Sequence, residues 1–531
     1  MIAIPDLQLG FRDAENYRRK ENKELFNRIF VRTQELDRVC APGTFFVVGE
    51  KGTGKTAYAI YLANNNYENI FASLRYIRET EYQKFVEMKR SRHLTLSDYT
   101  NIWKIIIYLL IAEQITAREG NNSFWNKFDK FRNLKAAIDE YYKNAFSPEI
   151  IYAIQFAEES EISAQLISKY ANVGGKDKTK LSFSKNQFQT NLFYIQRQFE
   201  DALRSLKLEH NHLVFIDGID IRPGSIPYED YSECIKGLAN AVWSVNNDFF
   251  STIKDSKGRL RAVLLLRPDI LDSIGLQNQN SKLRDNSVVL NWLTTYKDQR
   301  ESALFHMADR LLAFQQDGLD DVGKAWDYYF PFDDTKLKSP QEGLSSFVLV
   351  LRNAMYRPRD VLAILGILKD NFIEQKRGKN SLFSQKDFTD PMFTRKYSDY
   401  LLGEVKDQLS FYYPAADWEK FVNFFHYLQG HSRFTYDQYL DSYNHYMTFL
   451  QRNNEKIPTF SVTADKFLQF LYDLNVISYI VETEDNERFF GFCFRERTTT
   501  NIAPKVRTGV RYEIHYGLMK ALDLGKKFKR A

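Results

Sequence analysis

Residues 45–56 decide the fold, and they read Phe45-Phe46-Val47-Val48-Gly49-Glu50-Lys51-Gly52-Thr53-Gly54-Lys55-Thr56. Four strand-forming residues run into Gly-x-x-x-x-Gly-Lys-Thr, and a helix-forming segment, 57–63, follows at once. Strand, glycine-bearing loop and helix in this order are the context in which such a loop binds phosphate. The sequence therefore predicts a phosphate-binding loop between the first strand and the first helix of an α/β core.

The residue types of this loop suit a nucleoside triphosphate. Glycines let the backbone approach phosphate and aim several N–H groups at it, and the following helix presents its positive N-terminal end. Lys55 is expected to reach the β- and γ-phosphates, and the Thr56 hydroxyl to bind Mg²⁺. We therefore predict ATP and Mg²⁺ as cofactors. The predicted nucleotide ligands are Gly49, Gly52, Thr53, Gly54, Lys55, Thr56 and Ala57.

Length and composition are those of a soluble protein with several domains. The chain has 531 residues, of which 44% are hydrophobic and 27% charged. The net charge of +5 permits contact with nucleic acid without indicating it. The aromatic share, 15%, is high, and we interpret it as aromatic packing between helices rather than base stacking.

Several classes of protein are disfavoured. The three cysteines, Cys40, Cys234 and Cys493, lie far apart, which argues against a disulfide framework or a zinc site. The N-terminus does not resemble a signal peptide, and the longest apolar run, 105–112, is too short to span a bilayer. We expect a cytoplasmic protein without membrane contact. The sequence contains no H-E-x-x-H or G-x-S-x-G motif, so catalysis other than ATP hydrolysis is not indicated.

Four further segments predict strands of a parallel sheet. Segments 212–220 and 261–269 each contain a continuous apolar run that ends in charged residues. Such runs are typical of central parallel strands covered on both faces. Segments 69–74 and 287–292 are expected to add two more strands. Because helical patterns separate these segments, the fold class is an α/β P-loop NTPase core with a parallel sheet.

Three domains are expected. The core covers 1–295 and includes a helical insert at about 75–200, where the chain is longer than such a core needs. A helical lid follows over 296–394, with Pro358 as a helix-start signal. A winged-helix-like domain covers 395–531.

The order of elements within the C-terminal domain carries that last assignment. Four helices precede a predicted hairpin of 476–481 and 488–494, and a closing helix is expected over 512–522. The candidate recognition helix, 463–474, carries few basic residues, and the basic tail 526–530 is expected to be solvated. Nucleic-acid binding through this domain therefore stays an alternative to protein interaction.

Asp217 is the predicted Walker B acid. It ends an apolar strand, where a carboxylate could hold Mg²⁺ beside Thr56, and the alternative is a solvated strand-end acid. Many hydrolysing ATPases place a glutamate at the next position, which here is Gly218. Asp220 is the nearest substitute, so the rate of hydrolysis is open.

Arginines supply candidate contacts to the γ-phosphate. Arg267 ends the next strand and could sense that phosphate, or the turn 267–269 could pair internally. Arg357 and Arg359 open a lid helix and could close over the phosphates, or be solvated at the helix start. Lys282 and Arg284 could offer a cationic finger to a neighbouring subunit, although solvation is the simpler interpretation.

Together these segments resemble bacterial P-loop ATPases of the AAA+ and STAND-like range, similar in architecture to origin-recognition ATPases. The matching segments are 30–36, 49–56, 215–220, 266–270, 357–360 and 512–518. The resemblance implies an AAA+ core, a lid and a winged helix that act as an ATP-dependent switch, often within anti-phage gene clusters. It implies sensor roles for Arg267 and Arg359. Gly218 departs from the hydrolytic AAA+ pattern and is closer to STAND proteins.

We therefore predict an ATP-binding switch that hydrolyses ATP slowly or on stimulation, self-associates, and acts with a separate effector protein. Two alternatives stay open. One is a DNA-binding ATPase that loads or remodels complexes through the winged helix. The other is a nucleotide-stabilised scaffold that does not turn over.

Overall fold

The structure, a computed structural model, describes most of the chain as two compact units. The core unit comprises Gln34–Val48 and Lys55–Val289, and the helical unit comprises Met1–Thr33, Gly49–Gly54 and Leu290–Ala531. The phosphate loop is thus divided between Gly54 and Lys55. The described residues are 1–77, 96–119, 196–197, 199–275, 284–319, 321–333, 345–378, 380–482 and 488–525.

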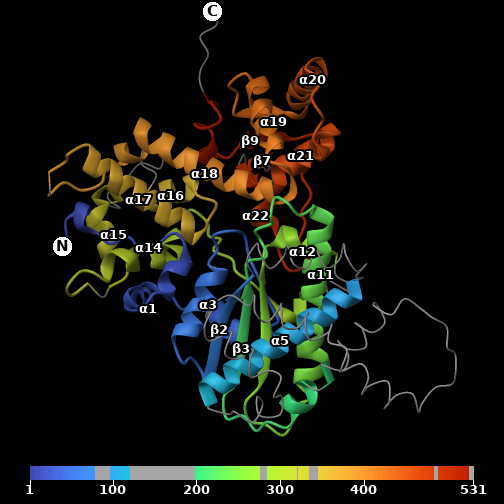
Figure 1. The fold of residues 1–531 in the computed structure, drawn as a ribbon. Helices are drawn as coiled ribbons and strands as arrows, with labels where there is room; N and C mark the ends of the chain where they lie inside the picture. Colours follow the sequence, from blue (N-terminus) through green and yellow to red (C-terminus); the bar gives the residue numbers. More distant parts are fainter. Residues whose placement is uncertain are drawn as a thin grey trace, which may run out of the picture. The chain divides into compact units, whose positions relative to one another are not determined.

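A five-stranded parallel sheet forms the centre of the core unit, in the order β2-β3-β4-β1-β5 (Figure 1). Every residue of β1 and β4 is buried, as expected for strands covered on both faces. The predicted parallel α/β sheet is confirmed, although its last strand ends at Val289 rather than at Trp292. The strands are β1 Phe46–Val48, β2 Ile70–Tyr76, β3 Asn211–Asp217, β4 Leu260–Leu266 and β5 Ser287–Val289.

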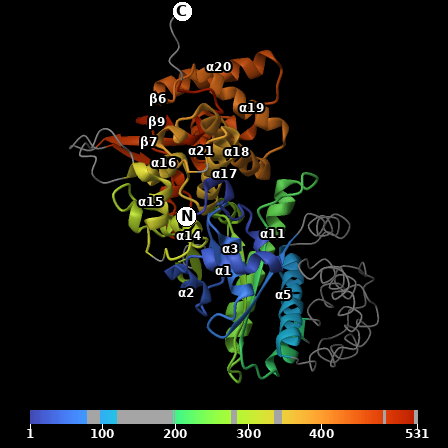
Figure 2. The same ribbon diagram turned by 90° about the vertical axis from the view of Figure 1, so that its left-hand side faces the viewer.

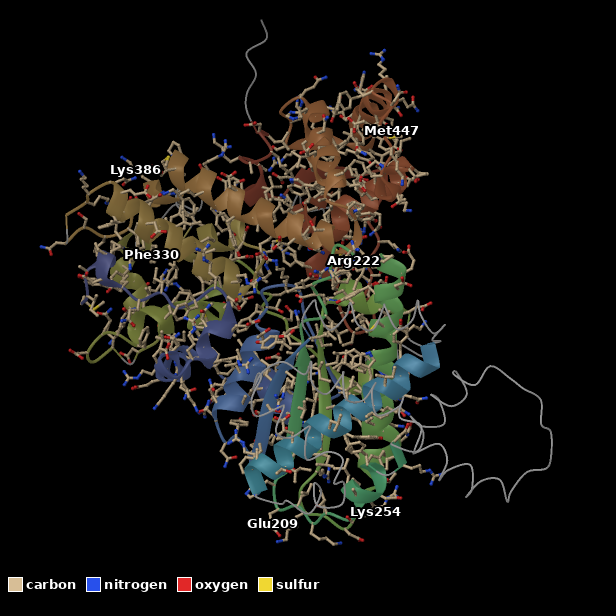
Figure 3. The ribbon with its side chains drawn as sticks, viewed as in Figure 1. Glu209, Arg222, Lys254, Phe330, Lys386 and Met447 are labelled. Carbon is tan, nitrogen blue, oxygen red and sulfur yellow. The ribbon has the colours of Figure 1, made fainter. Side chains whose placement is uncertain are left out.

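Helices cover both faces of this sheet (Figure 2). From β1 the chain crosses the sheet past β4 and β3 to reach β2, and it then returns in the other direction through β3 and β4. Right-handed crossovers therefore place α3 on one face and α5 and α11 on the other. Figure 3 marks the two ends of β3, with Glu209 before it and Arg222 after it. The helices are α2 Gln34–Cys40, α3 Lys55–Asn64, α5 Leu96–Glu119, α11 Tyr228–Ser244 and α12 Pro268–Ile274.

Helix α5 is the main described part of the predicted insert, whose first residues, 75–76, end β2. It packs along α11, where the Trp103 Nε1–H donates to the Cys234 carbonyl at 3.2 Å. Residues 78–95 and 120–195, including the polar loop 174–180, lie outside the described residues. Among the helices that the structure describes, none has the length and apolar character needed to cross a membrane.

The first part of the helical unit contains the helices predicted for a lid. Ser302 and Ser345 cap α14 and α16, because their side chains accept the N–H groups of Phe305 and Val348. Helix α17 begins at Pro358, as predicted. The expected boundary at 394/395 falls inside α18, and the three-domain division stays a prediction. The helices are α1 Lys23–Ile29, α14 Ala303–Ala313, α15 Lys324–Tyr329, α16 Ser346–Asn353, α17 Pro358–Glu374 and α18 Pro391–Tyr412.

The last part of this unit combines helices with a four-stranded antiparallel sheet in the order β6-β9-β7-β8. The predicted hairpin is confirmed as β7 and β8, but the chain then forms the short helix α22. The predicted closing helix over 512–522 is wrong, because its first residues form β9 and pair with β7. The elements are α19 Ala416–Phe424, β6 Arg433–Thr435, α20 Tyr436–Arg452, α21 Ala464–Asp473, β7 Ile477–Glu482, β8 Arg488–Gly491, α22 Cys493–Glu496 and β9 Arg511–Ile514.

Aromatic rings fill the space between α19 and α21. Phe421, Phe424 and Phe467 are fully buried, and Phe424 meets Phe467 edge to face with ring centroids 4.7 Å apart. Phe460 stacks on Phe470 at 4.8 Å. Pairs of this kind add stabilisation beyond the area they bury. Here the aromatic content serves packing, as the sequence indicated.

A pH-dependent contribution to stability is expected at His515. Burial lowers the pKa of this imidazole from 6.5 to about 4, against an opposing effect of Asp360. The neutral ring accepts from the Gly517 N–H at 3.2 Å and donates to the Ala354 carbonyl at 3.3 Å. Since the unfolded chain binds a proton near pH 6.5 and the folded chain does not, stability falls as pH drops from 6.5 towards 4.

From pH 7 to pH 5 we expect His515 to reduce the free energy of unfolding by about 2 kcal/mol. Urea unfolding of the full chain at both pH values measures this loss. His515→Gln should be somewhat less stable at pH 7 and should lose less stability between the two pH values. An equal loss in wild type and variant contradicts the prediction.

Candidate phosphate-binding site

Within the core unit, the loop leads into α3, whose first two residues are Lys55 and Thr56. The Thr56 hydroxyl donates to Asp217 Oδ2 at 2.6 Å, although β4 lies between β3, which ends at Asp217, and β1, which precedes the loop. Lys55 is buried, with 8% of its surface exposed. The expectation that Asp217 lies beside Thr56 is therefore met in the geometry of this unit.

Opposing influences act on the Asp217 carboxyl. Burial raises its pKa, and the neighbouring Asp220 raises it further, whereas the Thr56 hydroxyl, the Lys55 charge and the Gly218 N–H lower it. The Gly218 N–H donates to Asp217 Oδ1 at 2.8 Å. A carboxylate and a hydroxyl this close are oxygen ligands of the kind that Mg²⁺ takes.

Thr56 and Asp217 provide two oxygen ligands, which suits a cation whose other ligands come from a bound molecule and water. Across the described residues, no group of three or more His, Cys, Asp or Glu side chains is placed to hold a metal ion. Magnesium usually binds through one or two protein oxygens together with phosphate oxygens and water. Thr56 and Asp217 therefore fit Mg²⁺ carried by a nucleotide better than a resident metal.

Gly218 occupies a position that excludes side chains. Its φ is +88°, and a Cβ there would lie 2.5 Å from the Ile77 carbonyl oxygen. Ile77 is fixed in place, because its N–H donates to the Asp217 carbonyl at 2.9 Å. A glutamate after Asp217 is thus sterically excluded in this chain, which the sequence alone did not show.

Two arginines of the core unit have carboxylate partners: Arg267, predicted to sense the γ-phosphate, and Arg284, predicted as a cationic finger for a neighbouring subunit. Arg267 is buried and forms a two-point ion pair with Asp269, with Nε to Oδ1 at 3.0 Å. This is the internal pairing left open above, and a sensor role stays a prediction. Arg284 pairs with Asp285 at 3.1 Å, and both side chains are more than half exposed. Lys282 lies outside the described residues.

Within the helical unit, the loop residues Gly49–Gly54 have their own supports. Gly52 and Gly54 have φ values of +88° and +95°, which glycine adopts without strain. The Thr53 hydroxyl donates to the Glu50 carbonyl at 2.9 Å, and the Trp292 indole N–H donates to the Thr53 carbonyl at 2.8 Å. No local pattern in the sequence indicated this role for Trp292.

Arg357 supports the backbone of the loop, and a contact of this residue with phosphate stays a prediction. Its Nη1 donates to the Lys51 carbonyl at 2.9 Å, while Nε and Nη2 bind the two oxygens of Asp360 at 2.9 and 2.7 Å. Asp360 is fully buried and also accepts the Met355 N–H at 2.8 Å. Such a pair is costly to break, because the remaining charge would be buried alone.

Arg359 lies directly against the loop. A Cβ on Gly52 would come within 3.0 Å of the Arg359 Cβ. The guanidinium donates to the Arg12 carbonyl at 3.2 Å and to Glu404 Oε2 at 3.5 Å. The structure thus places Arg359 beside a predicted phosphate ligand, and its sensor role stays a prediction.

Ion pairs also tie the loop side chains to later helices. Lys51 Nζ lies 2.6 Å from Asp407 Oδ2 and 3.6 Å from Glu404 Oε1, both on α18. Glu50 pairs with Arg497, which follows α22. No local pattern in the sequence pointed to these partners, because each pair joins segments more than 350 residues apart.

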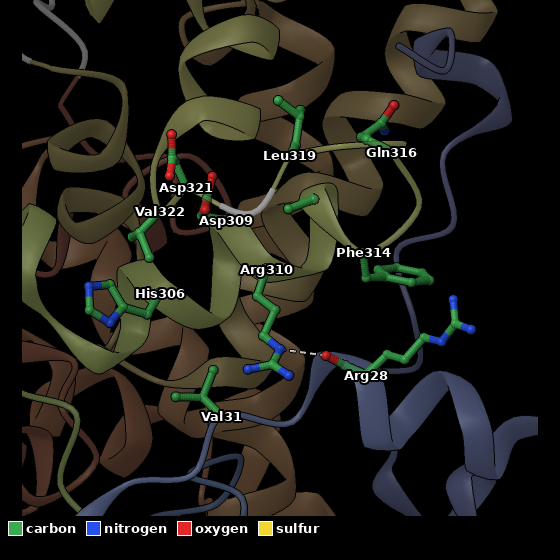
Figure 4. Close-up of a pocket in the computed structure, with 11 residues that line it drawn as sticks. Arg28, Val31, His306, Asp309, Arg310, Phe314, Gln316, Leu319, Asp321 and Val322 are labelled. Atoms are coloured by element: carbon green, nitrogen blue, oxygen red, sulfur yellow. Dashed lines mark hydrogen bonds between the residues drawn. The ribbon is translucent and has the colours of Figure 1, made fainter.

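A cleft of about 490 Å³ lies elsewhere in the helical unit, between α1, α14 and the segment after α14 (Figure 4). Its Arg310 donates to the Arg28 carbonyl. Its Asp309 accepts the N–H groups of Gly323 and Trp326 at 2.8 Å each. These groups are engaged in local structure, so we assign the cleft no role.

No protein-family model matches this sequence, and a comparison with curated proteins gives no significant match.

Proposed function

We propose that this protein binds ATP with Mg²⁺ at residues 49–57 and hydrolyses it slowly, as a switch of the AAA+ or STAND type. The observation that carries the proposal is the 2.6 Å hydrogen bond between Thr56 and Asp217, residues 161 positions apart. Thr56 is the last residue of the Gly-Lys-Thr sequence, and Asp217 is the last residue of a buried parallel strand. A Mg²⁺–triphosphate needs these two ligands together.

Each residue has a distinct task in this proposal. Backbone N–H groups between Gly52 and Ala57 bind phosphate oxygens, apart from that of Thr53, which donates to the Glu50 carbonyl at 3.2 Å. Lys55 neutralises charge on the β- and γ-phosphates. Thr56 and Asp217 hold Mg²⁺, which would screen the phosphate charge. Asp220 is the carboxylate available to orient water, because position 218 cannot carry one. Slow turnover follows from that substitution.

The switch requires contacts that depend on the γ-phosphate. Arg359 beside Gly52 is the cation best placed within the helical unit to respond to nucleotide. A ligand that binds one conformation better shifts the population towards it. We include in this proposal self-association, a separate effector protein, and the anti-phage setting that the family resemblance suggests.

A DNA-dependent ATPase is the second candidate. The helices α19, α20 and α21 precede the β7–β8 hairpin, an order that favours a winged helix. Stimulation of phosphate release by duplex DNA supports this candidate over a purely protein-directed switch.

Calorimetric titration with ATP and Mg²⁺, followed by phosphate release with and without duplex DNA, tests the proposal. Light scattering in the same buffers reports self-association. Binding with slow release is expected. Absence of ATP binding overturns the proposal, whereas binding without release in any condition leaves a nucleotide-stabilised scaffold.

A further inference from the structure

Glu404 lies between two cations at the phosphate loop. Its Oε1 is 3.6 Å from Lys51 Nζ, and its Oε2 is 3.5 Å from Arg359 Nη1. Lys51 belongs to the loop, Arg359 opens α17, and Glu404 sits in the middle of α18. One carboxylate therefore forms ion pairs with both the loop and the first turn of α17.

This arrangement is partly shielded from water. The side chains of Glu404, Lys51 and Arg359 are 14%, 23% and 25% exposed. Charges at such sites are screened less by salt than fully exposed pairs. Lys51 has a second partner in Asp407, whereas Glu404 is the carboxylate paired with Arg359 among the described residues.

The position of the Arg359 guanidinium is restrained by its neighbours. Its Nε is already bound to the Arg12 carbonyl, and its aliphatic stem lies against Gly52. A phosphate bound at the Gly52 backbone would attract the same positive charge that Glu404 partly neutralises. The carboxylate and an incoming phosphate are therefore competing partners of one cation.

We propose that Glu404 is a positioning residue that holds Arg359 away from nucleotide and thereby lowers the affinity for ATP relative to ADP. This inference rests on the proposed function. Arg359 leaves Glu404 when it binds the γ-phosphate. Helix α18, which carries Glu404, therefore loses this ion pair when ATP binds. Nucleotide state then reaches the C-terminal helices through one ion pair.

Glu404→Gln tests this inference, since the amide keeps the size of the side chain and removes its charge. We expect ATP to bind about 3- to 5-fold more tightly, with ADP affinity nearly unchanged. The gain should disappear when the same change is made in an Arg359→Ala background. Competition with a fluorescent nucleotide measures both affinities.

Asp399→Asn is the matched control. It removes a carboxylate from the same helix, where Asp399 is half exposed and, within the described part of the chain, pairs with Arg395 one turn away. It should leave both affinities unchanged. Melting temperatures without nucleotide report whether any variant is simply less stable.

The outcomes separate this inference from the proposed function. If wild type binds no ATP, the proposed function itself fails. If wild type binds ATP but Glu404→Gln leaves the ATP-to-ADP ratio unchanged, only the role of Glu404 is overturned. A gain that persists in the Arg359→Ala background is a general field effect and also overturns it.

Discussion

Lys55→Ala is expected to weaken ATP binding about 10- to 100-fold and to abolish measurable phosphate release. The lysine follows the last loop glycine and is largely buried beside the Asp217 carboxylate. A charge-assisted contact to the β- and γ-phosphates is worth more than a neutral hydrogen bond, and alanine removes it completely. Titration calorimetry and phosphate release measure both effects.

Loss of folding must be separated from loss of binding in this variant. Removal of Lys55 takes away a positive charge that favours the ionised form of Asp217, so some loss of stability is expected without nucleotide. The decisive reading is the rise in melting temperature on addition of ATP and Mg²⁺, which should occur in wild type and vanish in the variant. Lys257→Ala, at an exposed lysine of the same unit, should retain it. An unchanged rise in Lys55→Ala contradicts the assignment.

The sequence was sufficient where a local pattern has one physical meaning. Short, continuous apolar runs that end in charged residues predicted β3 and β4, because every position of a strand covered on both faces is buried. The glycine spacing predicted a loop between β1 and α3, and the end of the apolar run predicted that Asp217 closes a strand; their roles in nucleotide binding stay predictions. These are properties of short segments, so no long-range information was required.

Pairs between residues far apart in the chain do not follow from local sequence patterns. Glu404 and Arg497 are unremarkable charged residues in sequence, and only the folded chain brings them to the loop. Residues 511–514 show the same limit. They fit a helical pattern, but alternate burial of Tyr512 and Ile514 against β7 stabilises a strand instead. The pairing of Arg267 with Asp269 is local by contrast, and the sequence had left it open as an alternative to a sensor role.

Gly218→Ala is expected to reduce the free energy of unfolding by about 3 kcal/mol. Two costs combine in this estimate. A φ of +88° is unfavourable for any residue with a Cβ, and that Cβ would lie 2.5 Å from the Ile77 carbonyl oxygen. Because the Ile77 backbone is hydrogen-bonded to Asp217, it cannot move away without disturbing the end of β3.

Gly275→Ala separates these two costs. Gly275 lies in the same unit with a φ of +54°, but a Cβ there would meet nothing within 4 Å. Its substitution should cost only about 1 kcal/mol, from backbone conformation alone. Urea unfolding of both variants measures the difference, and equal losses contradict a steric role for Ile77. The same clash applies to Gly218→Glu, so restoring the acid found in many hydrolytic ATPases should destabilise the protein rather than accelerate phosphate release. The absence of a glutamate at position 218 then follows from the close approach of the residues after β2 and β3, Ile77 and Gly218. A glutamate there could support faster hydrolysis only if the Ile77 backbone were displaced.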